Sequence, residues 1–155
     1  MKKGFKLLVC TLSLLLIAGC VNSSKHPETI DEVMDGVYEG LKEEELPMML
    51  ELFPIDEENE EWFLGTTEID YKEALACESG VGSVPHSVVL IEAKKAEDVE
   101  NIKKQLKDSM NGHKWVCVGV QDEDIIIENQ GNYIIMILDG FDLAPTLLDN
   151  FNDLF

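Results

Sequence analysis

The stretch IIIENQGNYIIMIL, residues 125–138, holds two apolar runs on either side of five polar or small residues. The runs Ile125–Ile127 and Tyr133–Leu138 are rich in residue types that favour β-strands. Between them, Asn129-Gln130-Gly131-Asn132 has the composition of a hairpin turn. The stretch therefore predicts two antiparallel strands joined by a short connection.

A second pair of strands is predicted upstream. Tyr71–Cys77 alternates loosely between apolar and polar residues, and Val88–Ile91 is a continuous apolar run. Gly80–Pro85, which lies between them, has the glycine and proline content of a turn. Met48–Phe53 is apolar but ambiguous, and Trp115–Val120 is predicted to be extended.

Four segments predict helices. Apolar residues recur at helical spacing near the N-terminus, in the middle and at the C-terminus (Ile30, Val33, Met34, Val37 and Leu41; Val99, Ile102, Leu106 and Met110; Leu143, Leu147, Phe151 and Leu154). The fourth is a short helix that we expect to begin at Asp56, as its N-cap, and to end at Gly65. We expect Gly112 to end the central helix and Asp142 to cap the last one.

The resulting order is helix, helix, strand, strand, helix, strand, strand, helix. Short links between paired strands favour a single α+β domain with a small antiparallel sheet of about four strands. Val88–Ile91 and Tyr133–Leu138 are apolar at odd and even positions alike, so both faces of the sheet should be covered. We expect the helices to cover both faces. If they covered only one, the other would be left for a partner or a ligand.

The first twenty residues resemble the leader of a bacterial lipoprotein. Lys2, Lys3 and Lys6 precede an apolar run of about a dozen residues, which suits a secretory signal and is too short to cross a bilayer. Ile17-Ala18-Gly19-Cys20 is similar to the lipobox, whose cysteine is acylated. The resemblance implies cleavage before Cys20 and a diacylglycerol linked to its sulfur.

These features predict three parts of the chain. Residues 1–19 are expected to be a signal peptide, residues 20–27 the lipidated cysteine with a short tether, and residues 28–155 a globular domain. The lipid would hold the domain at the extracytoplasmic face of the cell membrane. The alternative is an ordinary cleaved signal followed by a chance cysteine.

The composition argues against one class of partner. The 155 residues contain 31 acidic side chains against 12 basic ones, a formal net charge of −19, and every basic side chain is lysine. Nucleic-acid binding begins with a basic face. We therefore expect no nucleic-acid partner.

Two cysteines remain for the domain. Cys10 would leave with the signal peptide, and Cys20 would carry lipid. Cys77 and Cys117 can form a disulfide in an exported protein, and two buried free thiols are the alternative. The sequence leaves both open, because the distance between the two residues decides.

No pattern predicts catalysis, a metal or a cofactor. We expect His26, His86 and His113 to be surface histidines, because they are not spaced as zinc ligands and no local signature pairs them with a cysteine nucleophile. The acidic runs at residues 56–61 and 122–124 lack the spacing of an EF-hand, although weak divalent-ion binding is a hypothesis for them. We predict that the protein is not an enzyme and that no residue is catalytic.

Short matches spread along the chain resemble one family. They are Glu45-Leu46-Pro47-Met48, Ile55-Asp56-Glu57-Glu58 running to Trp62, Val88–Ala93, and Gly131-Asn132-Tyr133 leading into Ile134–Leu138. In this order they look like an uncharacterised lipoprotein family of Firmicutes, known as domain of unknown function 4358, over most of residues 28–153. This chain departs from the family in a shorter stretch at residues 111–120 and in the Gly-rich turn at Gly80. The resemblance implies a location in the cell envelope and brings no activity.

The sequence thus predicts a lipid-anchored envelope protein that works by binding. A protein-binding or accessory role is the first hypothesis, because the anchor and tether are present and no catalytic motif is found. Binding of a small ligand or a divalent ion is the alternative.

Overall fold

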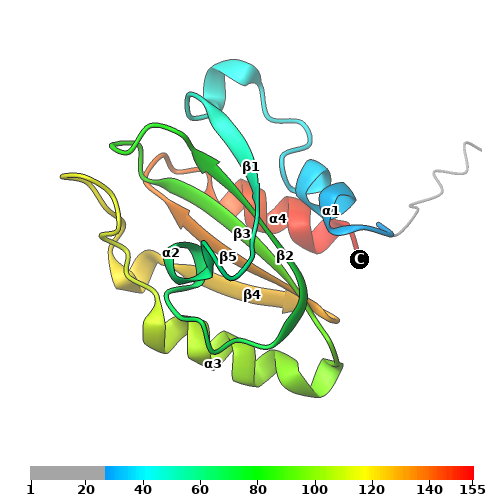
Figure 1. Cartoon of the computed structure of the whole chain (residues 1–155). Helices are drawn as coiled ribbons and strands as arrows, with labels where there is room; N and C mark the ends of the chain where they lie inside the picture. The colour runs from blue at the N-terminus through cyan, green and yellow to red at the C-terminus, as the bar shows by residue number, and fades with distance from the viewer. Residues whose placement is uncertain (1–26) are drawn as a thin grey trace, which may run out of the picture.

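The computed structural model describes residues 27–155, so the expectations for the signal peptide, Cys20 and His26 lie outside the described residues. The described part is an α+β domain built on one five-stranded antiparallel sheet (Figure 1). Its strands stand in the order β1-β2-β3-β5-β4. Their bounds are Leu50–Pro54 (β1), Tyr71–Ser79 (β2), His86–Ala93 (β3), Ile126–Gln130 (β4) and Tyr133–Asp139 (β5).

The predicted hairpin of residues 125–138 is confirmed. β4 and β5 pair antiparallel from Ile126↔Ile137 to Gln130↔Tyr133, so only Gly131 and Asn132 form the turn. Gly131 has a φ of 55°, which fits a turn whose first central residue must take a positive φ. β5 then pairs with β3, which places the most apolar strand of the chain at the centre of the sheet.

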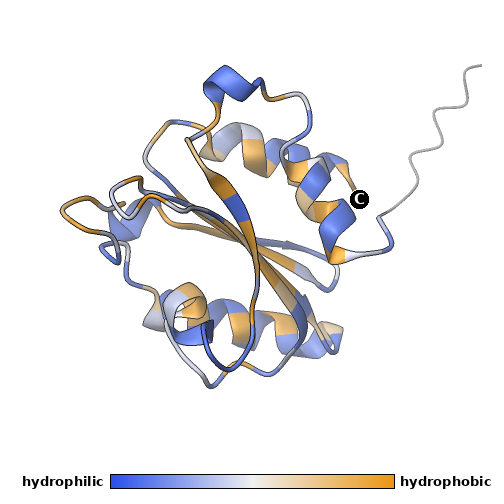
Figure 2. Ribbon diagram, turned by 45° about the horizontal axis from the view of Figure 1, so that its top comes forward, coloured by the Kyte–Doolittle hydropathy of each residue, from blue (hydrophilic) through white to orange (hydrophobic). Residues whose placement is uncertain are grey.

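Helices cover both faces of the sheet, as expected (Figure 2). α1 (Ile30–Val37) and α4 (Ala144–Asp153) pack on one face, and α2 (Glu60–Leu64) and α3 (Val99–Ser109) lie on the other. The α1–α4 core and the α3 core are therefore separate layers on the two sides of one sheet. β3 contributes residues to both cores, because its side chains alternate between the two faces of the sheet. Val88 and Leu90 lie in the α1–α4 core, whereas Val89 and Ile91 lie in the α3 core.

The sheet has five strands instead of about four, because the ambiguous segment around Met48–Phe53 contributes β1. This strand is at the edge and pairs only with β2, in a register that sets Leu52 opposite Cys77. Trp115–Val120, predicted to be extended, belongs instead to an irregular loop between α3 and β4. Its backbone turns sharply at Cys117, whose φ is 63°, and this conformation is incompatible with a strand.

Two predicted helix caps are wrong. Asp56 accepts the backbone N–H of Glu58 in a turn, and α2 begins only at Glu60. Asp142 has a φ of 63° and does not cap α4. That role belongs to Asp139, whose carboxylate lies at the end of β5 and accepts backbone N–H groups at the start of α4.

Candidate functional site

A groove runs along β4, at the open edge of the sheet. Its volume is about 530 Å³. It lies where the two helical layers meet the edge strand, and it is lined by the end of α3, by the residues that lead into β4 and by one residue of α4 (Lys107, Asp108, Met110, Asp122, Ile125, Ile126, Ile127, Glu128 and Leu148). The floor is apolar and the rim carries charges of both signs. This composition is typical of a surface that binds a peptide segment.

The backbone of β4 is available on the groove side. β4 pairs with β5 alone, so its other edge has no strand partner within residues 27–155. The closing pair Gln130↔Tyr133 flanks a two-residue turn and is hydrogen-bonded. Because hydrogen-bonded positions alternate along an antiparallel pair, the N–H and C=O groups of Ile127 and Asn129 face the open edge. An edge of this kind can accept an added strand.

Side chains of α3 hold the rim of this edge in place. Lys103 Nζ donates to Asn129 Oδ1 at 3.0 Å and lies 3.6 Å from Glu128 Oε2. Lys107 and Asp108 continue the rim at the end of the helix. The rim therefore offers both acidic and basic partners to an approaching segment.

A buried polar chain crosses the opposite layer. His86 Nδ1 lies 2.7 Å from Asp139 Oδ1, and its Nε2 lies 2.8 Å from the hydroxyl of Tyr38. The side chain of Cys77 lies beside the same hydroxyl and interacts with it. With His86 neutral, the phenol donates to Nε2 and Nδ1–H donates to Asp139.

Tyr38 and Cys77 hold their protons firmly, whereas Asp139 loses its proton more readily than usual. Burial raises the pKa of the Tyr38 phenol, and Cys77 and Asp139 raise it further. Burial also raises the pKa of the Cys77 thiol, although the bond to Tyr38 offsets part of the shift. Burial alone would raise the pKa of Asp139, but the hydrogen bonds from His86 and from the backbone of Leu143 bring it below its usual range.

The polar chain resembles a nucleophile, base and acid in order, but its position does not suit catalysis. The side chains of His86 and Asp139 have no exposed surface. A reacting group must approach a catalytic histidine directly or through one water molecule. The chain instead ties α1, β2, β3, β5 and the start of α4 together, which is a structural role. The expectation of a surface position for His86 is therefore wrong.

The other predicted residues lie apart from one another. Cys77 is buried in the α1–α4 core and Cys117 is exposed in the loop at residues 111–121, and both are free thiols in this structure. His113 is exposed in the same loop, where it lines a shallow depression with Cys117. Cys117 and His113 therefore share an exposed depression, but no hydrogen bond joins their side chains within residues 27–155.

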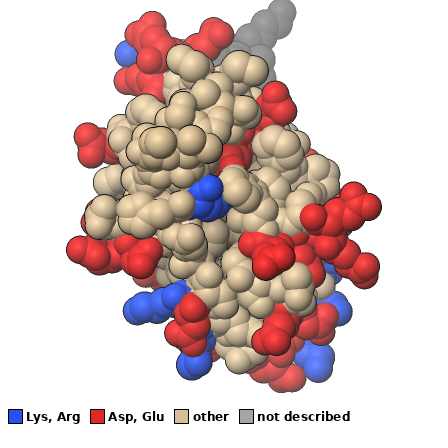
Figure 3. All heavy atoms as spheres, turned by 60° about the vertical axis from the view of Figure 1, so that its left-hand side comes forward, with Lys and Arg blue, Asp and Glu red and all other residues tan. Residues whose placement is uncertain are grey.

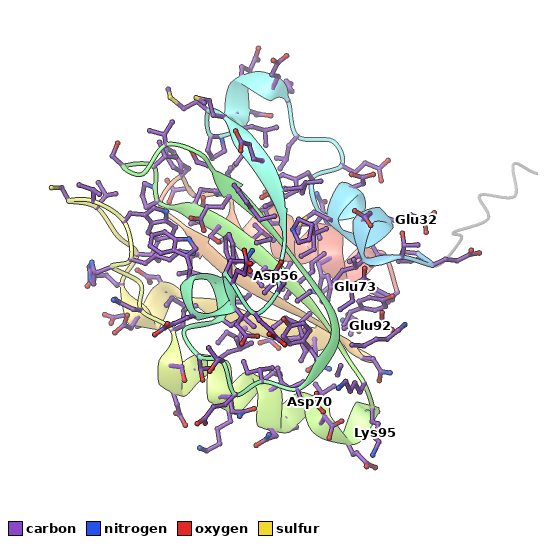
Figure 4. All side chains as sticks on the ribbon, in the orientation of Figure 1. Glu32, Asp56, Asp70, Glu73, Glu92 and Lys95 are labelled. Atoms are coloured by element: carbon purple, nitrogen blue, oxygen red, sulfur yellow. The ribbon has the colours of Figure 1, made fainter. Side chains whose placement is uncertain are left out.

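Carboxylates also gather along the side of the sheet where β2 begins. Figure 4 shows Glu32, Glu73 and Glu92 there. All three raise the pKa of Tyr133, which burial raises first. Glu92 pairs with Lys72 at 2.8 Å.

Within residues 27–155, no three His, Cys, Asp or Glu side chains lie close enough together to hold a metal ion. No helix in the same range is long and apolar enough to cross a membrane.

Comparison of the chain with protein-family models, with curated proteins and with solved structures gives no match in any of the three. The resemblance to the Firmicutes lipoprotein family therefore stays a prediction.

Proposed function

We propose that the protein is a lipoprotein anchored by an acylated Cys20 at the extracytoplasmic face of the cell membrane, and that it binds a protein partner there. The partner would contribute an extended segment that adds to β4 as a sixth strand. The open edge of β4 inside a groove between α3 and α4 carries this proposal.

Several features of the edge support strand addition. The side chains of Ile125 and Ile127 pack on the α3 core and Ile126 on the α1–α4 core, yet all three are partly exposed in the groove. An added strand would cover them, and alternate side chains of that strand would meet the two layers. By contrast, the strand at the other edge, β1, ends in Pro54, and proline is a common protection of a sheet edge.

The anchor is tested by replacing its cysteine. In cells fed a labelled fatty acid, Cys20→Ser should abolish incorporation and move the protein out of the membrane fraction. Cys117→Ser is the matched control and should leave both unchanged. Label retained by the Cys20→Ser protein would refute lipidation at this residue.

The binding edge is tested with Asn129→Pro. Because the N–H of Asn129 faces the open edge, proline there should block an added strand and leave the β4–β5 ladder intact. Asn129→Ala loses the same contacts to Lys103 and Gly131, so it is the matched control.

The readout is crosslinking on intact cells from a photoreactive amino acid at Glu128. We expect one adduct that persists in Asn129→Ala and disappears in Asn129→Pro. The same probe at Glu44, exposed on a different part of the molecule, should not form it. An adduct that survives Asn129→Pro, or that forms equally from Glu44, would refute docking at β4.

A further inference from the structure

A buried lysine occupies an aromatic cage on the α3 side of the sheet. Lys114 comes from the irregular loop at residues 111–121, and its Nζ lies 5.1, 5.1 and 5.0 Å from the ring centroids of Trp62, Phe63 and Trp115. Cation–π attraction acts within about 6 Å of a ring centroid. One ammonium group thus meets three aromatic rings from two separate parts of the chain.

A buried carboxylate completes the cage. Lys114 Nζ donates to Glu78 Oε2 at 2.6 Å, and each of the two side chains is only 6% exposed. Trp62 Nε1 donates to the other oxygen, Glu78 Oε1, at 3.0 Å. The hydroxyl of Ser87 lies 3.4 Å from the ammonium. Glu78 therefore uses both oxygens on groups of the cage, which orients its charge toward the cation.

Two observations indicate that burial in the cage is costly for its polar groups. Burial lowers the pKa of Lys114 despite the neighbouring carboxylate of Glu78, so desolvation of this ammonium outweighs its pairing. The indole Nε1 of Trp115, whose ring belongs to the same cage, is also buried without a hydrogen-bond partner among residues 27–155.

The cage lies beside solvent, and the segment that fills it has no regular secondary structure. Trp62 is 46% exposed and Val116, two residues after Lys114, is 68% exposed. Figure 3 shows this side of the molecule as a largely uncharged area with acidic side chains around it. The loop has no helix or strand, and a backbone hydrogen bond from Val116 to Gly82 joins it to the β2–β3 turn. Lys114 can therefore leave by rotation of its own side chain, while Trp115, which is buried in the α3 core, and the strand that carries Glu78 stay in place.

We propose that Trp62, Phe63, Trp115 and Glu78 form a binding site for an organic cation of the alkylammonium class, which Lys114 occupies until a ligand displaces it. Aromatic faces with a nearby carboxylate recognise such cations, because the rings attract the charge and exclude water from it. The surrounding acidic surface attracts cations toward the site. This inference goes beyond the proposed partner binding at β4 and is independent of it.

The test uses the full chain in a neutral maltoside detergent, titrated with n-propylammonium chloride and tetramethylammonium chloride. Lys114→Ala empties the cage, and n-propylammonium matches the atoms that this change removes. Lys114→Met is the matched control, because its uncharged side chain still fills the cage. Sodium chloride and 1-propanol separate the effects of salt and of an apolar solute from cation binding.

Two signals report binding. The chain has two tryptophans, Trp62 and Trp115, so their indole N–H resonances are readily assigned with Trp62→Phe. Both resonances should shift with the ammonium ions in the wild type and not with 1-propanol. Lys114→Ala should bind about tenfold more tightly than the wild type and melt at a higher temperature with the cation, because no internal competitor remains. Lys114→Met should not respond.

If the indole resonances of the wild type did not shift with either cation, the proposal would be overturned, even if those of Lys114→Ala did shift. Lys114 would then be a fixed structural residue that no ligand displaces. A folded Lys114→Ala protein whose indole resonances and melting temperature do not change with either cation would also overturn the proposal. If Lys114→Ala does not fold alone, the wild-type titration decides. The partner and the anchor play no part in these measurements, so their failure and the failure of β4 docking can be told apart.

Discussion

Replacing Asp139 should separate the loss of a hydrogen-bond acceptor from the loss of a buried charge. Its Oδ1 accepts from His86 Nδ1 at 2.7 Å, and its Oδ2 accepts the backbone N–H groups of Leu143 at 2.6 Å and Ala144 at 3.2 Å. Asp139→Ala leaves these three donors without their acceptor. The side chain of His86 has no exposed surface, so water cannot replace the lost partner there.

The size of the effect follows from the number of donors. An unsatisfied buried donor costs about 1–3 kcal/mol, and three donors lose their acceptor when Asp139 is replaced by alanine. Since the start of α4 can recover part of its loss from solvent, we expect Asp139→Ala to lower the free energy of unfolding by about 3–5 kcal/mol. With an m value of about 2 kcal/mol/M, the urea midpoint would fall by about 1.5–2.5 M.

Asp139→Asn should cost only about 1–2 kcal/mol, because the chain of hydrogen bonds can reverse. The amide oxygen of Asn would accept from the start of α4, and its NH₂ group would donate to His86 Nδ1. His86 would then carry its proton on Nε2 and donate to Tyr38, whose hydroxyl would donate to the sulfur of Cys77. Part of this cost is the lost attraction between a carboxylate and the helix N-terminus, about 0.3–1 kcal/mol, and the rest is the exchange of charge-assisted hydrogen bonds for weaker neutral ones.

Urea titrations of residues 21–155 measure both variants, and ¹⁵N spectra of the imidazole identify the tautomer of His86. The wild type should carry its proton on Nδ1 and Asp139→Asn on Nε2. If Asp139→Asn were as unstable as Asp139→Ala, the negative charge and not the hydrogen-bond chain would be what Asp139 supplies. An unchanged tautomer would refute the reversal directly.

Three further outcomes are expected. Because burial raises the pKa of Tyr38, the folded state keeps a proton that the unfolded chain releases near pH 10. The free energy of unfolding should therefore fall above pH 10 by up to about 1.4 kcal/mol per pH unit. Urea midpoints measured between pH 8 and 11 should show that the fall contributed by Tyr38 is absent in Tyr38→Phe. In native residues 21–155, a thiol reagent should modify Cys117 rapidly and Cys77 only on unfolding, and a disulfide between them would leave neither reactive. Gly112→Ala should destabilise the domain more than Gly82→Ala in thermal unfolding, since a Cβ at Gly112 would lie 2.1 Å from a backbone oxygen and one at Gly82 would meet nothing within 4 Å.

The sequence predicted the sheet well where apolar runs were long and turn residues unambiguous. The hairpin at residues 125–138 is the best case, because the composition of each strand and of its turn agree. β1 was not predicted, because it is an edge strand in which only Leu50 and Phe53 are partly buried. Its sequence therefore shows no alternation of apolar and polar residues. An edge strand takes its structure from its neighbour, which a local pattern does not contain.

The loop at residues 111–121 was misread because its composition imitates a strand. Trp115 and Val120 are buried, whereas Val116 and Cys117 between them are exposed. The apolar residues of this segment therefore do not lie on one face, as those of a strand would. The usable signal was Gly119, where a Cβ would lie 2.3 Å from the ring of His113. A glycine that close to another side chain marks a compact loop.

Both buried polar networks were invisible as motifs, because their members are far apart in sequence. His86 meets Asp139 across 53 positions, and Glu78 meets Lys114 across 36. One signal was present: Glu78 and His86 are polar residues at the ends of strands that are otherwise buried. A buried polar side chain needs a partner, so such positions predict a network without identifying its other half.

The two networks differ in what must move before anything can reach them. The two networks use adjacent residues of the same strands, namely Cys77 and Glu78 on β2 and His86 and Ser87 on β3. Because neighbouring side chains of a strand point to opposite faces of the sheet, one network lies on each face. His86 is held between β-strands and helices of the α1–α4 core, so exposing it requires breaking that core. Lys114 is held by a loop without regular structure, whose opening leaves the sheet intact. Local opening needs less free energy than global unfolding, so backbone amides of the loop should exchange hydrogen faster than those of β3 and β5. Of the two buried networks, only the one around Lys114 can therefore exchange its occupant for a ligand while the domain stays folded.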